Sequence, residues 1–373
     1  MRYQQEEVYI QHMNKLKVVC ARALMGCSLV LLATTARCQV GENFFIYVSN
    51  ERSDNVSVID AATHETVATI AVGKRPRGIH VSPDGKAVYV AVSGTPPEPP
   101  PKLDANGNPI FQKGHDDDDD DKNADKSADG IAIIDVATRT LKGKLPAGSD
   151  PEQFAVSSDG TRLFISNEDV ATASVLNIAT GAVEKIIPVH KEPEGVGIRP
   201  DGKVFYVTCE TDGEIFAIDA STFKVINHFN VGGRPRSVDF LADGSRAFIP
   251  SESAGQLHVI DSQSHQPLET IALAKGNRPM CVKVSTDNKK VYAGTGRAGT
   301  ICVMDVGSHK ILNYIKAGTR PWGIIISPDG KFLYSANGPS NDISVIDLEA
   351  EKELQRIPAG KSPWGIVLVA KSL

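Results

Sequence analysis

Short runs of apolar residues recur along the chain at a nearly constant interval. Each run contains an aromatic residue and is followed by a second run that ends in Ile-Asp or an equivalent pair. The aromatic residues are Tyr47, Tyr89, Phe164, Tyr206, Phe248, Tyr292 and Tyr334, and the second runs end at Asp60, Asp135, Asn177, Asp219, Asp261, Asp305 and Asp347. These end points are spaced by 75, 42, 42, 42, 44 and 42 residues. Short apolar runs at a fixed period indicate a repeat architecture built from strands.

Each repeat divides into four predicted strands. In the second copy, residues 78–82 and 87–91 form a hairpin around Ser-Pro-Asp-Gly, in which Pro presets φ and Gly supplies a left-handed position. The other two strands follow the pattern of residues 55–60 and 66–73 in the first copy. Seven four-stranded antiparallel units of about 42 residues predict an all-β fold, a seven-bladed β-propeller.

The two ends of the repeat region complete one blade. The region starts near residue 44 with three of the four strands, and it finishes with the missing one at residues 363–370. We expect the C-terminal strand to join the N-terminal three, because this pairing closes the ring and removes exposed strand edges.

The repeat motif resembles a known family. The sequence YVSNERSDNVSVID, with its GxxPxG and SPDG elements, is similar to the YVTN-repeat (YncE-like) β-propellers over residues 44–370 apart from one insertion. Within that family, GSDPEQFAVSSDG, SNED, GGRPRSVDF and NGPSNDISVID resemble the β-propeller proteins associated with pyrroloquinoline-quinone-dependent catabolism. The resemblance implies a propeller fold and an association with a pyrroloquinoline quinone system. The insertion and Cys209-Glu210 depart from the pattern of that subgroup.

The N-terminal segment reads as a targeting signal. Basic residues precede an apolar run at 23–36, which has signal-peptide length and is too short to span a bilayer. We therefore predict a signal peptide at 1–38, with Met13 as an alternative start of translation. We also predict an exported, periplasmic or secreted propeller domain at 39–373 without a transmembrane segment.

Charge and cysteine content narrow the function. Residues 1–38 carry five basic and two acidic residues, so their removal changes the formal net charge from −5 to −8. Nucleic-acid binding needs a basic face, and we expect none. Three cysteines lie beyond the signal, at Cys209, Cys281 and Cys302, and we predict that they are buried and unpaired. A bridge between Cys281 and Cys302 is not expected, because a whole strand separates them.

The long interval in the repeat comes from an insertion at 94–129, between two strands of one blade. It is rich in proline and then carries six consecutive Asp residues at 116–121. This composition predicts extended, solvated chain. Three interpretations of the insertion are open. It is an acidic loop without a specific function, a lid or docking arm for a partner, or a Ca²⁺ site formed by His115 and the Asp run.

One position of the repeat varies while its surroundings do not. The residue after the Pro that precedes the first strand of each blade should face the central channel. Around the ring this position is occupied by Arg77, Glu152, Glu194, Arg236, Met280, Trp322 and Trp364. The two tryptophans are the only ones in the protein. We predict that these seven residues line a ligand-binding mouth, since concave sites with a few convergent polar groups are the usual location for ligands.

A second set of charges belongs to the same face. It comprises Glu51, Glu168, Glu210, Glu252, Arg75, Arg234 and Arg320. Acidic and basic residues on adjacent blades could pair and lock the loops together, with the tryptophans filling the channel. Alternatively, Arg77 and Arg236 could bind an anion such as a sugar acid or a quinone carboxylate, and the Glu set could bind Ca²⁺. His80 and His190 are the histidines that could lie in the channel.

Three functions remain open on this sequence. It contains no G-x-S-x-G, H-E-x-x-H, C-x-x-C-H or phosphate-loop motif. The first prediction is a monomeric binding or accessory protein that recognises a small ligand or an exported protein partner at the channel mouth. The alternative is a lactonase-like hydrolase in which Glu152 and Glu194 act as acid and base, which requires separated pKa values. The third is a non-catalytic surface or scaffold protein.

Overall fold

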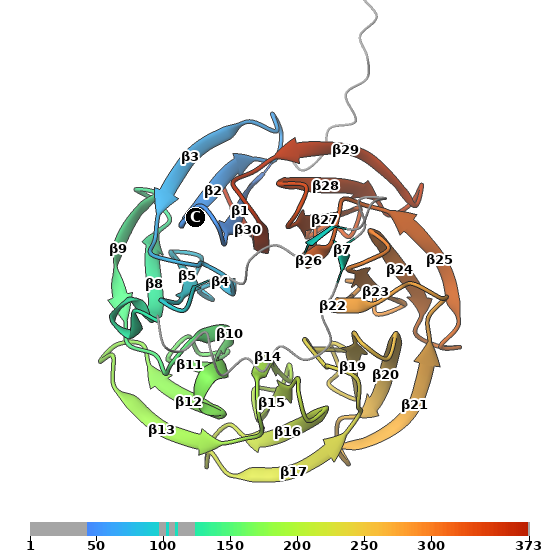
Figure 1. Ribbon diagram of the computed structural model, residues 1–373, viewed down its shortest axis with the longest axis horizontal. Coiled ribbons are helices and arrows are strands. Elements are labelled where there is room, and N and C mark those ends of the chain that lie inside the picture. Colours follow the sequence, from blue (N-terminus) through green and yellow to red (C-terminus); the bar gives the residue numbers. More distant parts are fainter. Residues whose placement is uncertain (1–42, 97–101, 104–108, 111–123, 372–373) are drawn as a thin grey trace, which may run out of the picture. The chain divides into compact units, whose positions relative to one another are not determined.

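Each repeat folds into one four-stranded antiparallel sheet, and seven such sheets surround a central channel in the computed structural model (Figure 1). The structure describes residues 43–96, 102–103, 109–110 and 124–371, which belong to the unit Val40–Leu373. The predicted signal peptide lies outside the described residues. The predicted seven-bladed all-β fold is confirmed.

We number the blades from the first one that is continuous in sequence. Blade 1 contains β4 (Ile79–Val81), β5 (Ala87–Val92), β8 (Gly130–Asp135) and β9 (Thr140–Leu145). Blade 2 contains β10 (Pro151–Val156), β11 (Arg162–Asn167), β12 (Thr172–Asn177) and β13 (Val183–Pro188). Blade 3 contains β14 (Pro193–Ile198), β15 (Val204–Cys209), β16 (Glu214–Asp219) and β17 (Val225–Asn230).

The second half of the ring follows the same order. Blade 4 contains β18 (Asp239–Phe240), β19 (Arg246–Ser251), β20 (Gln256–Asp261) and β21 (Gln266–Ala272). Blade 5 contains β22 (Pro279–Val284), β23 (Lys290–Thr295), β24 (Thr300–Asp305) and β25 (Ile311–Lys316). Blade 6 contains β26 (Pro321–Ile326), β27 (Phe332–Asn337), β28 (Asp342–Asp347) and β29 (Lys352–Pro358). Blade 7 contains β30 (Pro363–Ala370), β1 (Phe44–Asn50), β2 (Asn55–Asp60) and β3 (Thr66–Ala71).

Blade 7 closes the ring as predicted. The C-terminal strand β30 pairs antiparallel with β1, so that Tyr47 lies opposite Val367 and Ile46 opposite Leu368. The innermost strand of this blade therefore comes from the end of the chain and the other three from its beginning (Figure 1).

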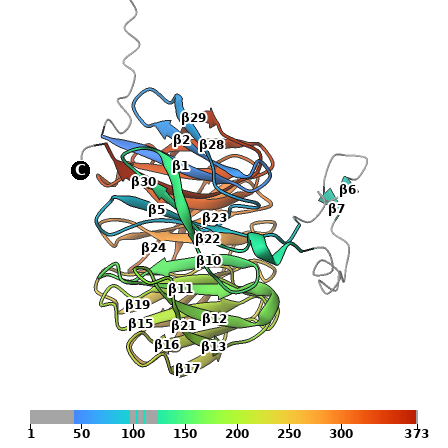
Figure 2. The same cartoon turned by 90° about the vertical axis from the view of Figure 1, so that its left-hand side faces the viewer.

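The apolar core lies between neighbouring blades. A buried apolar cluster fills each of the seven blade interfaces in the described propeller. Between blades 2 and 3, for example, Phe164 stacks on Phe205 at 4.3 Å between ring centroids. The two blades are neighbours in the ring (Figure 1), and the side view shows β11–β13 close to β15–β17 (Figure 2). Each blade of the closed ring thus buries both of its faces. This explains why its two middle strands are continuous apolar runs.

Small residues set the distance between the innermost strands. In the repeated phrase, a Gly follows the variable channel position in four blades, at Gly78, Gly195, Gly323 and Gly365. A Cβ at any of these would lie 2.6–2.7 Å from a backbone carbonyl oxygen of the adjacent blade. The backbone of Gly78 uses this approach to donate a hydrogen bond to Glu152 O at 3.0 Å. The glycines therefore bring the channel positions of adjacent blades together.

The described part of the insertion includes two short strands. β6 (Lys102–Leu103) and β7 (Pro109–Ile110) pair antiparallel, and extended, solvated chain over the segment as a whole stays a prediction. Asn106-Gly107 lies between them in the sequence, and this dipeptide favours hairpin turns. The end of the insertion includes a 3₁₀ turn, Lys126–Ala128, and Asp125 N donates to Gly94 O at 3.0 Å. His115 and the Asp run lie outside the described residues.

Two further predictions concern residues of the described propeller. Cys209, Cys281 and Cys302 are buried and free, and β23 separates the last two, as predicted. No helix in the described part of the chain is long and apolar enough to cross a membrane.

Candidate active site

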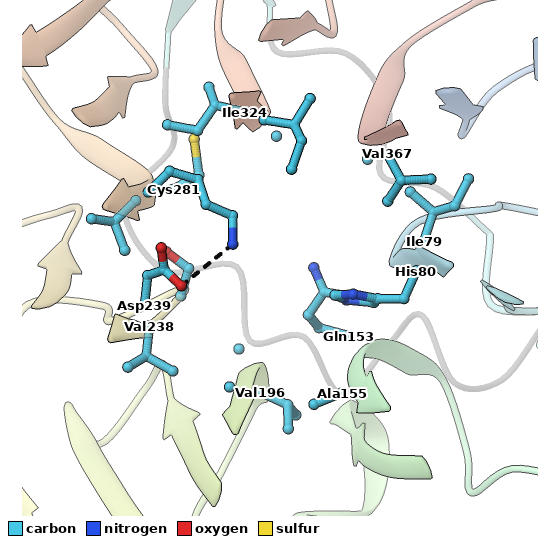
Figure 3. Close-up of a pocket in the computed structure, with 18 of the residues that line it drawn as sticks. Ile79, His80, Gln153, Ala155, Val196, Val238, Asp239, Cys281, Ile324 and Val367 are labelled. Carbon is cyan, nitrogen blue, oxygen red and sulfur yellow. Dashed lines mark hydrogen bonds and ion pairs between the residues drawn. The ribbon is translucent and has the colours of Figure 1, made fainter. Parts of the chain in front are cut away.

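The seven innermost strands of the described propeller enclose a cavity of about 460 Å³ along the channel (Figure 3). This volume is within the range of pockets that bind small molecules. Aliphatic side chains, including Ile79, Val196, Val238 and Ile324, form much of its wall. The polar and charged side chains that interrupt this wall are the groups that can give specificity.

Most of the predicted channel residues reach this cavity. Its lining includes Glu152, Glu194, Arg236, Met280, Trp322 and Trp364, which we call the upper ring. The upper ring has an acidic part on blades 2 and 3, a guanidinium on blade 4 and an aromatic part on blades 6 and 7. Propeller symmetry brings these six residues to one level although they are far apart in sequence.

Arg77 differs from the expectation that it lines the channel. Its side chain is only 1% exposed, and its guanidinium is surrounded by carboxylates of blade 2. Nη1 donates to Glu152 Oε2 at 2.7 Å and to Glu168 Oε2 at 3.1 Å, and Nη2 is paired with Asp150. Three acidic groups draw the guanidinium away from the cavity, so Arg77 acts on the site through Glu152.

The acidic part of the site holds protons unusually well. Burial raises the pKa of Glu194 to about 7, with Arg236 opposing the shift and the charge of Glu168 adding to it. Burial also raises the pKa of Glu152, against the opposing charge of Arg77. Burial and the charge and hydrogen bond of Glu152 raise the pKa of Glu168 well above its ordinary value. At neutral pH, Glu194 is therefore close to its midpoint.

Arg236 is the cation of the upper ring. It pairs with Glu194 through Nη1, with Glu252 Oε2 through Nε at 2.6 Å, and with Glu210 Oε2 through Nη2 at 2.9 Å. Burial disfavours its charge, but the carboxylates of Glu194 and Glu252 hold the pKa of Arg236 above its ordinary value. A guanidinium carries five N–H donors, so these three pairings leave donor capacity for a ligand.

The aromatic part faces the acidic part across the channel. Trp322 and Trp364 stack with ring centroids 5.9 Å apart and an angle of 19° between their planes. The guanidinium carbons of Arg320 and Arg236 lie 4.4 Å and 5.5 Å from the Trp322 ring centroid. These cation–π contacts fix the Trp322 ring and hold positive charge beside it.

The remaining predicted charges lie outside the cavity lining. Arg75 joins three blades, since its Nε is 3.1 Å from Glu51 Oε1 and its Nη1 is 3.2 Å from Asp150 Oδ2. Arg234 pairs with Glu210. The sequence analysis offered ion pairing between adjacent loops as an alternative to ligand binding. These residues form such pairs.

Deeper in the channel the cavity has a second set of polar residues, which we call the lower level. The sequence analysis identified only His80 among them. His80 lines the cavity and receives a contact from Gln153, with 3.1 Å between His80 Nε2 and Gln153 Oε1. Asp239 and Lys283 also line the cavity and form an ion pair at 3.4 Å. Three of these residues occupy the third place after the variable channel position of their blades, a signal that the sequence contains. His190 is elsewhere, 3.3 Å from Glu214 Oε2 and outside the cavity lining.

One group of carboxylates has the spacing that a cation needs. Oxygen atoms of Glu152, Glu168 and Glu194 lie within 4.8 Å of one another. All-oxygen ligation suits Ca²⁺. Arg77 Nη1 already neutralises two of the three carboxylates. Calcium binding by the Glu set therefore stays a hypothesis.

Comparison with known proteins adds a family. The sequence model of the family "Lactonase, 7-bladed beta-propeller" matches residues 42–199 and 251–359. This family is a different branch from the YVTN-repeat proteins named above, and the quinone-associated subgroup stays a prediction. A search of curated proteins finds no match.

Solved structures share the fold at low sequence identity. The Pseudomonas aeruginosa periplasmic gluconolactonase PpgL is 18% identical, with a TM-score of 0.64 and coverage of 88% of this chain and 99% of that one. A proposed 6-phosphogluconolactonase from Bacteroides fragilis is 18% identical, with a TM-score of 0.68 and coverage of 88% and 98%. Hydrazine synthase from Kuenenia stuttgartiensis is also 18% identical, with a TM-score of 0.64 and coverage of 80% and 96%.

Proposed function

The chain belongs to the seven-bladed β-propeller lactonase family, and from that premise we propose that its central cavity hydrolyses the ester bond of a lactone. The observation that carries the proposal is Glu194, a buried carboxyl with a pKa of about 7 that lines the cavity and contacts the guanidinium of Arg236. A general base works best when its pKa is near the working pH. The hydrolase alternative thus has more support than the binding role that we placed first from the sequence.

The residues of the cavity can be assigned to the steps of hydrolysis. Glu194 takes a proton from water, and the water oxygen adds to the lactone carbonyl carbon. The negative charge on the carbonyl oxygen is stabilised by N–H groups of Arg236. When the C=O bond re-forms, the ring C–O bond breaks and its oxygen leaves as an alkoxide.

The second carboxyl group completes the proton balance. The leaving alkoxide takes a proton from the Glu152–Glu168 pair, in which burial and the neighbouring Glu152 raise the pKa of Glu168 well above its ordinary value. The proton on Glu194 then returns to this pair, whose oxygens lie within 4.8 Å. The product is a hydroxy acid, and one water molecule is consumed. Glu152 contacts Arg77 and Glu194 contacts Arg236, so each of the two carboxyls has its own cation.

The test is hydrolysis of a panel of γ- and δ-lactones by wild type and Glu194→Gln, followed as acid release. We expect the substitution to reduce kcat/KM by about 10²- to 10⁴-fold, because it removes the base. The wild-type rate should rise with pH through about 7, because the active form of Glu194 is deprotonated. Glu184→Gln, which changes a carboxyl on β13 paired with Arg162 outside the cavity, is the matched control and should retain activity. Equal rates in both variants would remove Glu194 from the mechanism.

A binding role at the same cavity is the second candidate. The observation that favours it is the pairing of each charged upper-ring residue: Glu152 with Arg77, and Glu194 with Arg236. A site of this kind holds a ligand between the carboxylates and the Trp322–Trp364 stack without needing a free base. Ligand binding to purified protein that hydrolyses none of the lactones would support this candidate.

We also propose that the propeller acts outside the cytoplasm. The support is the apolar run at 23–36 after basic residues, in a segment outside the described residues. Expression in a bacterial host and mass measurement of the periplasmic product should show cleavage near residue 38. A full-length product that stays in the cytoplasm would contradict export.

A further inference from the structure

The lower part of the cavity carries a second set of polar groups that the proposed hydrolysis does not use. In blades 1, 4 and 5, the residue three places after the variable channel position is polar. These residues are His80, Asp239 and Lys283. At the same place the other blades have Ala155, Gly197, Ile325 and Val367, which offer no polar side-chain atom. Three residues along a strand correspond to about 10 Å, so this level lies well below the upper ring.

Gln153 fixes how His80 presents its ring. The backbone N–H of Phe154 can only donate, and it donates to Gln153 Oε1 at 3.2 Å. The same oxygen is 3.1 Å from His80 Nε2, so Nε2 must carry the hydrogen of this contact. Two groups remain available as a result, the Gln153 NH₂ as a donor and His80 Nδ1 as an acceptor. Figure 3 shows the His80 ring and the Gln153 amide side by side and directed into the channel.

The groups at this level carry no net charge. Burial lowers the pKa of His80 to about 4, and the charge of Lys283 contributes to the shift, so His80 is neutral at pH 7. Lys283 Nζ lies 3.4 Å from Asp239 Oδ1, and Asp239 Oδ2 also accepts from Val284 N at 2.8 Å. An anionic ligand would be attracted by the charge of Lys283 but repelled by the charge of Asp239. An uncharged group that both donates and accepts hydrogen bonds fits without either cost.

Aliphatic side chains form most of the wall between the two levels, and Ser237 adds a hydroxyl there. Ile79, Val196, Val238 and Ile324 line the cavity there (Figure 3). A ligand that reaches from the upper ring to Lys283 must therefore extend over about 10 Å of mostly aliphatic wall. An unsubstituted five- or six-membered lactone ring is too short to do this, whereas a lactone with a chain of about five carbons is long enough.

We propose that the cavity has a second recognition level, formed by His80, Gln153 and Lys283, that binds the uncharged hydroxyl or amide end of a side chain carried by the substrate. That the substrate is a lactone rests on the proposed function. That the lower level binds a neutral polar group does not depend on it. The enzyme is thus expected to prefer long lactones with a neutral polar end over short lactones and over those ending in carboxylate or phosphate.

The experiment compares four γ-lactones with wild type and three variants. The substrates are unsubstituted γ-butyrolactone and three derivatives with a five-carbon chain on the ring that ends in methyl, hydroxyl or carboxylate. The variants are Lys283→Met, Gln153→Leu and the control Lys331→Met, which changes an exposed turn lysine. Lys283→Gln is added in case the methionine variant does not fold.

Wild type should hydrolyse the hydroxyl-ended lactone with a kcat/KM about three- to tenfold above that of the methyl-ended one, the gain of one or two hydrogen bonds. Lys283→Met and Gln153→Leu should each reduce this preference by raising KM for the hydroxyl-ended lactone. Lys331→Met should behave as wild type. Equal rates for hydroxyl and methyl ends, or a preference for the carboxylate, would overturn the lower level and leave the hydrolase intact.

A binding measurement separates this proposal from the proposed function. Trp322 and Trp364 are the only tryptophans in the protein and both line the cavity, so intrinsic fluorescence reports its occupancy. The probes are the same four lactones, or their ring-opened acids if hydrolysis interferes. If no lactone is hydrolysed but the hydroxyl-ended probe binds more tightly than the methyl-ended one, and Lys283→Met removes the difference, the lower level stands without the hydrolase. No difference in binding or in rate would refute the lower level.

Discussion

Buried charges in this propeller occur in groups that combine residues from different blades. Arg77 of blade 1 is enclosed by Asp150, Glu152 and Glu168 of blade 2. Burial alone would raise the pKa of Asp150, but the charges of Arg77 and Arg75 bring it below its ordinary value. Such groups are stable only as a set, because a buried charge without its partner is costly. Each member therefore supports both the blade interface and the ionisation of the site.

We expect Arg77→Met to destabilise the protein by about 3–5 kcal/mol at pH 8, because three carboxyls lose their cation. Without Arg77 the pKa values of all three carboxyls rise in the folded state, and those of Glu152 and Glu168 already lie above their ordinary values. The folded variant then binds protons that the unfolded chain releases, so its stability falls as pH rises. The loss should therefore be smaller at pH 5. Urea unfolding at the two pH values measures this.

The control for that experiment is Arg162→Met. Arg162 forms an ion pair with Glu184 at the surface, 2.7 Å from Nε to Oε2, and its side chain is 36% exposed. Its loss should cost less than about 1 kcal/mol at either pH. If Arg77→Met were equally destabilised at pH 5 and pH 8, the carboxylates would not be the source of the effect.

At the scale of elements, the innermost strands have two tasks. They hydrogen-bond within their own blades, and they present the upper ring and the lower level to the cavity. β30 has a third task, since its pairing with β1 joins the two ends of the chain. Blade 7 packs against blades 1 and 6 through separate buried clusters, and β30 contributes Val367 and Val369 to one and Ile366 to the other.

Truncation after Ser362, which removes β30, should abolish cooperative folding of the monomer. The truncated blade would expose the edge of β1 and the apolar residues of both clusters, and exposed edges favour association. Circular dichroism during heating and size-exclusion chromatography would detect this. A truncation that removes only residues 372–373 is the control. A monomeric product of the longer truncation with a sharp thermal transition would show that ring closure is dispensable.

At the scale of the whole molecule, the cavity belongs to the ring and not to any blade. Each blade contributes one side chain to the upper ring, except blade 1, whose Arg77 is withdrawn behind Glu152. The ring places acidic groups, a guanidinium and stacked tryptophans around one space. The variable position of the repeat is thus where a common scaffold acquires a specific chemistry.

The sequence by itself determined the fold and the level of the site. The period of about 42 residues and the recurring turns, Pro-Asp-Gly in three blades, specify the four-stranded units, and the split blade at the two ends specifies a closed ring. The same frame located Glu152, Glu194, Arg236, Met280, Trp322 and Trp364 at the channel. Local patterns carry this information since they depend only on strand alternation and turn chemistry.

Only the tertiary structure decided which of these residues face the cavity and in what ionisation state. The sequence treated Arg77 and Arg236 alike, but Arg77 is buried among blade 2 carboxylates, and Arg236 lines the cavity. The sequence also gave no indication that Gln153 and Lys283 lie in the same part of the cavity as His80. Side-chain direction, burial and pKa depend on partners from other blades, and strand periodicity does not encode the distances between them.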